Sequence, residues 1–284
     1  RVQGSGNIVR LREAGHEGTM DIIALLAPAR NPFFSSFIDV FQRNADKNDS
    51  LVLYMQNPKG ERVEDNLFEI FQKEIQNVVI WLEDLELDVE YIRRLRGLGM
   101  NMVFFDVAMP MPYADCVLLD NTEAITALYH YLQRKGIKDI GYIGWDNLNL
   151  TSVREREKRF IELNGNVNIF HFKIPWTERK NLLDFLDRHV TNKKYKNKLP
   201  DGIICGDGEI GIALKKVFLA QGINNINVVS VDDFPEAESL SLTVYMQDFD
   251  KLAQKVYECL YVQNMKSKQW NASVYPIKGK LIER

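Results

Sequence analysis

Apolar residues gather in short, nearly continuous runs along the whole chain. Three early runs are Asp21–Leu26, Asn77–Leu82 and Met100–Phe105, and each is rich in β-branched or aromatic residues. The others are Leu51–Tyr54, Cys116–Leu119, Ile140–Ile143, Val167–Phe172, Gly202–Cys205, Val228–Val231 and Leu242–Tyr245. Continuous rather than alternating runs are typical of strands buried on both faces, as in a parallel sheet covered by helices.

Between these runs, apolar residues recur at spacings of three and four, with polar residues on the opposite side. This pattern predicts amphipathic helices over Phe34–Phe41, Leu67–Ile75, Leu128–Leu132, Ile210–Val217 and Leu252–Leu260. Alternating strands and helices indicate βαβ units. Because the strands are many for one doubly wound sheet, we predict an α/β protein with two Rossmann-like lobes and parallel sheets.

Charge and cysteine content narrow the class of protein. The 284 residues carry a net charge of −3, so the chain lacks the overall basic field of a protein that wraps nucleic acid by itself. Its cysteines, Cys116, Cys205 and Cys259, are far apart and form no CxxC pair. That spacing supports neither a disulfide framework nor a zinc site, and it fits reduced thiols in a cytoplasm. No apolar run approaches the ~18 residues of a membrane span, so no membrane contact is expected.

Sequence motifs of catalysis are missing. The chain contains no GxGxxG, phosphate-binding GxxxxGKS/T, GxSxG or HExxH. The histidines, His16, His130, His171 and His189, are dispersed, whereas metal or acid–base chemistry needs clustered partners. The sequence therefore predicts no catalytic residue, no metal and no cofactor, although an enzyme on a doubly wound fold stays open as a less favoured alternative.

Polar and aromatic side chains follow the carboxyl ends of many predicted strands, where open α/β sheets bind ligands. The candidate ligand-binding residues are Asn31, Phe33, Phe34, Asp106, Arg154, Trp176, Asp207, Asp232 and Gln247. Carboxylates accept from paired hydroxyls, Arg and Asn donate to oxygens, and aromatic faces cover C–H surfaces, so this set suits a neutral sugar. Two other roles stay open. Asp207 fits a helix N-cap equally well, and Phe33 and Phe34 fit a core.

Several motifs in order match one known family. They include Asn31-Pro-Phe-Phe34, Val117-Leu-Leu-Asp-Asn121, Thr151-Ser-Val-Arg-Glu-Arg156, Val228-Val-Ser-Val-Asp-Asp233 and Gln247-Asp-Phe249. From about Gly18 to Arg284 the chain resembles the effector-binding domain of lactose/galactose-type repressors, which is similar to periplasmic ribose-binding proteins. The resemblance implies a type I periplasmic-binding-protein-like fold whose lobes are joined by three crossovers. The first lobe would hold residues 19–119 and 248–271, and the second 120–247 and 272–284.

The resemblance also implies roles for individual residues. Asp106 would contact sugar hydroxyls, Arg154 would bind ring or hydroxyl oxygens, and Trp176 would stack on the ligand. Further cleft positions would be Asn31, Phe33, Phe34, Asp232 and Gln247. Val107 stands where many sugar-binding relatives have Arg, and Asp207 where many have Asn, which leaves the sugar open. Three carboxylates in one cleft disfavour an anion, so a neutral sugar is expected, a pentose such as arabinose being favoured.

Residues 1–9 carry the pattern R-x-x-G-x-G-x-x-V. It resembles the last wing strand of a gluconate-repressor-type winged helix, and arabinose-type repressors join such a domain to a sugar sensor. Residues 1–18 would then be a wing remnant and linker, with a disordered linker as the alternative. The expected protein is a cytoplasmic, homodimeric regulator that binds operator DNA through an upstream domain. The main alternative is a periplasmic sugar-binding protein of a transporter.

Overall fold

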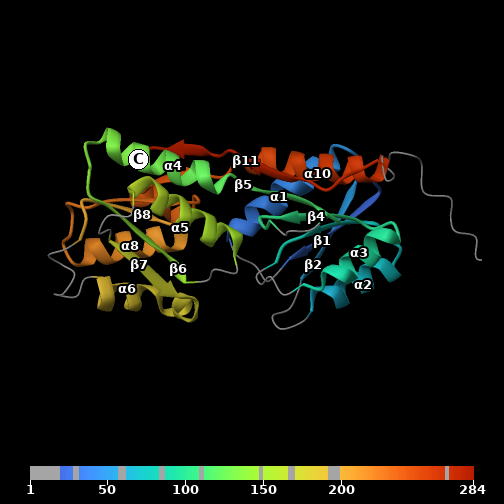
Figure 1. Ribbon diagram of the computed structural model, residues 1–284, viewed down its shortest axis with the longest axis horizontal. Helices are drawn as coiled ribbons and strands as arrows, with labels where there is room; N and C mark the ends of the chain where they lie inside the picture. Colours follow the sequence, from blue (N-terminus) through green and yellow to red (C-terminus); the bar gives the residue numbers. More distant parts are fainter. Residues whose placement is uncertain are drawn as a thin grey trace, which may run out of the picture.

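Two helix-covered sheets form two lobes that lie end to end along the long axis of the molecule (Figure 1). The computed structural model describes residues 20–27, 32–56, 62–82, 87–108, 112–146, 150–165, 170–190, 199–265 and 269–284, with only the backbone of 32 and 33. The expected wing segment and Asn31 lie outside these ranges. Within them, each sheet has six strands, and the predicted two-lobed α/β architecture is confirmed.

The first lobe has the strand order β11-β5-β4-β3-β1-β2, and every pair of neighbouring strands is parallel. Its strands are β1 (Ile22–Ala27), β2 (Leu51–Gln56), β3 (Asn77–Ile80), β4 (Asn101–Phe105), β5 (Asp115–Leu119) and β11 (Val274–Ile277). Its helices are α1 (Pro32–Asp46), α2 (Val63–Gln72), α3 (Val89–Gly97) and α10 (Phe249–Met265).

The second lobe repeats this arrangement with the order β12-β10-β9-β8-β6-β7. Its strands are β6 (Ile140–Asp146), β7 (His171–Pro175), β8 (Gly202–Cys205), β9 (Asn227–Val231), β10 (Thr243–Met246) and β12 (Lys280–Ile282), the last antiparallel to β10. Its helices are α4 (Asn121–Arg134), α5 (Thr151–Asn164), the 3-10 helix η1 (Trp176–Asn181), α6 (Leu182–Val190), α8 (Gly208–Ala220) and α9 (Pro235–Ser239).

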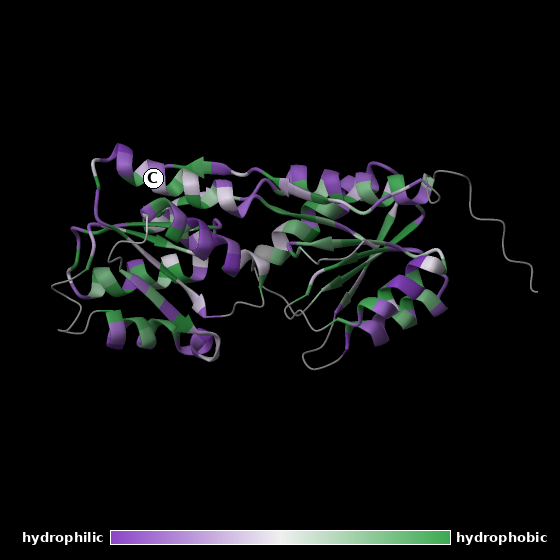
Figure 2. Cartoon of the chain, in the orientation of Figure 1, coloured by the Kyte–Doolittle hydropathy of each residue, from purple (hydrophilic) through white to green (hydrophobic). Residues whose placement is uncertain are grey.

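Burial on both faces explains the continuous apolar runs. In β1, Ile23 and Leu25 enter the core shared with α1 and α10, whereas Ala24 and Leu26 enter the core on the other face of the sheet. Figure 2 shows mostly hydrophobic strands inside each lobe, covered by helices that carry both hydrophobic and hydrophilic residues. The three cysteines are buried free thiols. Among the described residues, no helix combines the length and the apolarity needed to cross a bilayer.

Two sequence-based boundaries are corrected. The strand expected at Val167–Phe172 is β7, which spans His171–Pro175. Residues 272–284 do not all belong to the second lobe, because β11 pairs with β5 and extends the first sheet (Tyr275 beside Val117). The third crossover therefore follows Ile277, and only β12 joins the second sheet.

The three crossovers between the lobes are linked by the hydroxyl of Tyr245, at the end of β10. This hydroxyl accepts a hydrogen bond from the Gly279 N–H (2.9 Å) and donates to the Glu123 carboxylate in the first turn of α4. Gly279 is required by close packing, since a Cβ there would lie 2.2 Å from the carbonyl oxygen of Met246. One side chain thus connects residues beside each of the three crossovers.

Candidate ligand-binding site

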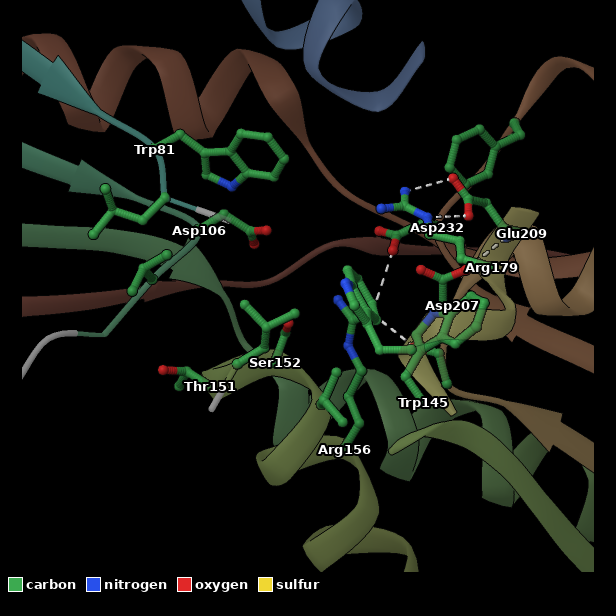
Figure 3. A pocket seen from close by; sticks show the side chains of 17 residues that line it. Trp81, Asp106, Trp145, Thr151, Ser152, Arg156, Arg179, Asp207, Glu209 and Asp232 are labelled. Carbon is green, nitrogen blue, oxygen red and sulfur yellow. Dashed lines mark hydrogen bonds and ion pairs between the residues drawn. The ribbon is translucent and has the colours of Figure 1, made fainter. Parts of the chain in front are cut away.

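The carboxyl ends of both sheets face a single cavity between the lobes (Figure 3). The first lobe contributes Trp81, Leu82, Asp106 and Val107. The second contributes Trp145, Leu150, Thr151, Ser152, Val153, Arg156, Trp176, Arg179, Gly206, Asp207, Glu209, Asp232 and Phe234. Among the described residues, no group of three His, Cys, Asp or Glu side chains is placed to hold a metal ion. The cavity offers hydrogen-bonding groups and aromatic rings.

Asp106 follows β4 and supplies the carboxylate of the first lobe. Its Oδ1 is buried and has no hydrogen-bond partner in the described part of the chain. Removal from water raises the pKa of Asp106 to about 7; the Asp232 charge adds to this, while Arg156 and a hydrogen bond from Trp81 oppose it. A buried acceptor without a partner is unfavourable, so Asp106 is suited to receive a donor from a guest.

Arg156 on α5 is the buried cation of the cleft, and its geometry is fixed on several sides. Its Nε donates to Asn121 Oδ1 (2.8 Å), and its Nη1 donates to the Gly206 carbonyl (2.7 Å) and to Asp232 Oδ2 (3.3 Å). Burial opposes the charge, but the carboxylates Asp232, Asp106 and Asp207 together outweigh it and raise the Arg156 pKa. The guanidinium therefore stays charged and in place.

Asp232 is held on its second oxygen by Gln247. The Gln247 Nε2 donates to Asp232 Oδ1 at 2.7 Å, so both carboxylate oxygens of Asp232 have partners. Gln247 is itself buried and does not line the cavity. The prediction that Gln247 contacts the ligand is therefore corrected: it lies one layer behind the cavity, where it orients the Asp232 carboxylate that does line it.

Asp207 combines the two roles that the sequence left open. Its Oδ1 accepts from the backbone N–H of Glu209 (2.7 Å) and Ile210 (3.3 Å), which caps α8, and the residue also lines the cavity. Burial, reinforced by the charges of Glu209 and Asp232, raises the Asp207 pKa to about 6.

The prediction that Arg154 binds the ligand is corrected. Arg154 is exposed on α5 and does not line the cavity, whereas Arg156 does. The buried face of α5 carries Val153, Arg156, Glu157 and Phe160, at helical spacings of three, four and seven. Arg154 lies off that face. The sequence does carry a signal for this choice: Arg156 lies four residues before the apolar Phe160, on the same face of the helix, whereas Arg154 lies six residues before it.

The prediction that Phe34 binds the ligand is also corrected, because Phe34 is a core residue. It is 1% exposed and stacks on Trp81, with ring centroids 5.2 Å apart and an angle of 14° between the planes. It supports the cavity wall without forming it. The side chains of Asn31 and Phe33 lie outside the described residues, so their predicted place in the cleft stays a prediction.

Trp176 lines the cavity as predicted, but other side chains engage its ring. The Arg179 guanidinium lies 5.0 Å from the ring centroid, and the Trp145 ring approaches edge-on at 5.3 Å. Arg179 is held by a bidentate ion pair with Glu209 at 2.7 and 2.8 Å. None of the predicted ligand-binding residues is Arg179, Glu209, Trp145 or Trp81, because the contacts that bring these four to the site join segments apart in the chain.

Comparison with known proteins places this two-lobed cleft in a family. The family model described as periplasmic binding protein-like domain matches residues 129–284. A comparison with curated protein sequences finds no match.

Many solved structures share the fold across both lobes, including the three that follow. A LacI transcriptional regulator from a Rhodococcus species has a TM-score of 0.76 and 14% identity, over 93% of this chain and 97% of that one. The trehalose repressor from Escherichia coli has a TM-score of 0.76 and 13% identity, over 93% of this chain and 100% of the repressor chain. The lac repressor dimer bound to operator and an anti-inducer has a TM-score of 0.73 and 15% identity, over 98% of each chain. The two-lobed fold implied by the sequence resemblance is confirmed, and the chain belongs to the family of periplasmic binding protein-like domains.

Proposed function

We propose that this chain is the effector-sensing part of a transcriptional regulator and that its cleft binds a small neutral sugar. One observation carries the proposal: Asp106 from the first lobe and Arg156 and Asp232 from the second line the same cavity. A guest that contacts both lobes at once binds the closed arrangement more tightly and shifts the population toward it.

The chemistry of the lining favours a neutral, hydroxyl-rich guest. Asp106 Oδ1 is open to a hydroxyl donor, and the hydrogen bonds of Arg156 within the described chain use Nε and Nη1, which leaves Nη2 for a sugar oxygen. An anionic guest would meet Asp106, Asp207 and Asp232 together, and like charges in a desolvated site repel. Among neutral sugars, the family resemblance favours a pentose such as arabinose.

The regulatory role rests on the fold and on the N-terminal pattern. Of the structures above that share the fold, one is named as a transcriptional regulator and two as repressors, and one of these repressors is bound to its operator. Residues 1–9 carry the wing-like pattern. Lobe closure in a homodimer would change operator affinity through a DNA-binding domain, with a coupling free energy of typically ~1–3 kcal/mol. The alternative is a transporter's sugar-binding protein, favoured by the family description; the gene sequence upstream of Arg1 separates the two.

The test of ligand binding is calorimetry with L-arabinose, D-xylose, D-ribose, D-galactose and D-glucose. The variants are Arg156→Lys, which keeps the charge but loses the planar fork, and the matched control Arg154→Ala. We expect one sugar to bind the wild type and the control equally, and the Arg156 variant at least about tenfold more weakly, a loss of ~1.4 kcal/mol. No binding by any sugar, or equal effects of the two substitutions, contradicts the proposal.

A further inference from the structure

We infer that Trp81, on the first lobe, is the aromatic platform on which the sugar ring stacks. This inference rests on the proposed function, and it differs from the family resemblance, which puts stacking at Trp176. Trp81 follows β3 directly and lines the cavity beside Asp106 (Figure 3).

The position of the Trp81 ring is fixed from behind. Phe34, fully in the core, stacks on the indole at a centroid distance of 5.2 Å and an interplanar angle of 14°. Phe34 is in turn packed against Phe37 at 6.2 Å. A ring backed in this way on one face loses little freedom when a guest covers the cavity side, which favours binding.

The indole is also coupled to the polar part of the site. The two side chains line the cavity side by side, the indole counteracts the rise of the Asp106 pKa, and the Asp106 Oδ1 remains open toward a guest. A sugar laid with its C–H face on Trp81 would place hydroxyls at its edge within reach of that carboxylate. The indole and Asp106 thus form one surface, apolar on the ring and hydrogen-bonding at its edge.

Trp176 is less suited to the same task. The Arg179 guanidinium lies over its ring, and the bidentate ion pair with Glu209 holds Arg179 there. A sugar that stacks on the same face of Trp176 has to displace a paired cation. The structure therefore assigns the stacking to Trp81 and leaves Trp176 as a side wall. The ligand class that fits is a sugar ring with an uninterrupted C–H patch on one face.

The test compares Trp81→Leu, Trp81→Phe and Trp176→Leu by calorimetry with the five sugars named above. Stacking on an indole contributes enough that we expect Trp81→Leu to weaken binding by about tenfold or more, and Trp81→Phe, which keeps a ring, by less than about threefold. Trp176→Leu is expected to weaken binding less than Trp81→Leu. A larger loss with Trp176→Leu, or unchanged binding with Trp81→Leu, overturns the inference. If the wild type binds none of the sugars, the proposed function fails and this inference with it.

A second readout does not depend on the folding of the Leu variant. In the double variant Trp145→Phe/Trp176→Phe, the tryptophans left are Trp81 and Trp270, and Trp270 is engaged with Arg96 and Asp115 in the first lobe, outside the cavity lining. We expect the fluorescence of Trp81 in this double variant to change on titration with the sugar that binds. No change at sugar concentrations that saturate binding by calorimetry contradicts stacking on Trp81.

Discussion

Asp106 and Asp232 occupy equivalent positions in the two lobes. Each follows the corresponding strand, β4 or β9, in a left-handed backbone conformation, with φ of 60° and 69°. Each donates its N–H to the neighbouring strand, Asp106 to Val117 O (2.9 Å) and Asp232 to Tyr245 O (3.0 Å). Asp tolerates this conformation better than most residues. The repeated turn points one carboxylate from each sheet at the shared cavity.

Loss of Arg156 should destabilise the protein strongly. Arg156→Ala leaves Asp232 buried without its cation, and breaking a buried ion pair lowers the free energy of unfolding by about 3–5 kcal/mol. The control, Lys158→Ala on the exposed side of the same helix, removes only a surface ion pair and should change it by less than about 0.5 kcal/mol. Urea unfolding of both variants measures the difference. Equal urea midpoints for the two variants would show that the Arg156–Asp232 ion pair does not contribute to stability.

Stability of the ligand-free protein should fall as pH rises from 5 to 8. Folding raises the pKa of Asp106 to about 7 and of Asp207 to about 6, so the folded state binds more protons than the unfolded state across this window. The free energy of unfolding therefore decreases with pH, by roughly 1–2 kcal/mol per group after solvent screening. In Asp106→Asn the decrease should be smaller. A pH-independent wild type, or the same slope in the variant, would refute this reading of Asp106.

Sugar binding should show the opposite pH dependence. A hydroxyl donates to the ionised Asp106 carboxylate, so the affinity for the sugar should rise between pH 6 and pH 8. Asp106→Asn should flatten the rise. Calorimetry at the two pH values checks this, and an affinity that falls with pH would mean that Asp106 acts as a donor.

The Tyr245 hydroxyl should stabilise the segments that cross between the lobes. Tyr245→Phe leaves the Gly279 N–H and the Glu123 carboxylate without their shared partner, which should lower the free energy of unfolding by about 1–3 kcal/mol. Tyr261→Phe, at a 43% exposed tyrosine of α10, is the control and should change it by less than about 0.5 kcal/mol. Thermal unfolding measures both, and indistinguishable melting temperatures would exclude a structural role for the bond.

The sequence was sufficient for the two lobes because burial on both faces gives strands such as β3 and β4 an unbroken apolar pattern. It was insufficient for β11, where Pro276 lies in a half-exposed strand at the sheet edge, a place that tolerates proline. At the site, Asp106 and Asp232 could be predicted because a carboxylate after a buried strand stands out.

Other site residues lacked such a local signal. Trp81 lies within the apolar run Asn77–Leu82 and looks like one more strand residue until the fold places it beside Asp106. The pairing of Arg179 with Glu209 joins segments 30 residues apart, so only tertiary structure reveals it. Arg156 was missed because a neighbouring arginine two positions earlier fits the family motif as well, and only the helix face separates them.

The central claim is that side chains of both lobes hold one sugar. Calorimetric titration of the wild type, Asp106→Asn and Asp232→Asn with the sugar panel tests it most directly, because each variant changes the carboxylate of one lobe only. We predict that both substitutions weaken binding of the same sugar by at least about tenfold. Full affinity in either variant would place the sugar on a single lobe and contradict the account.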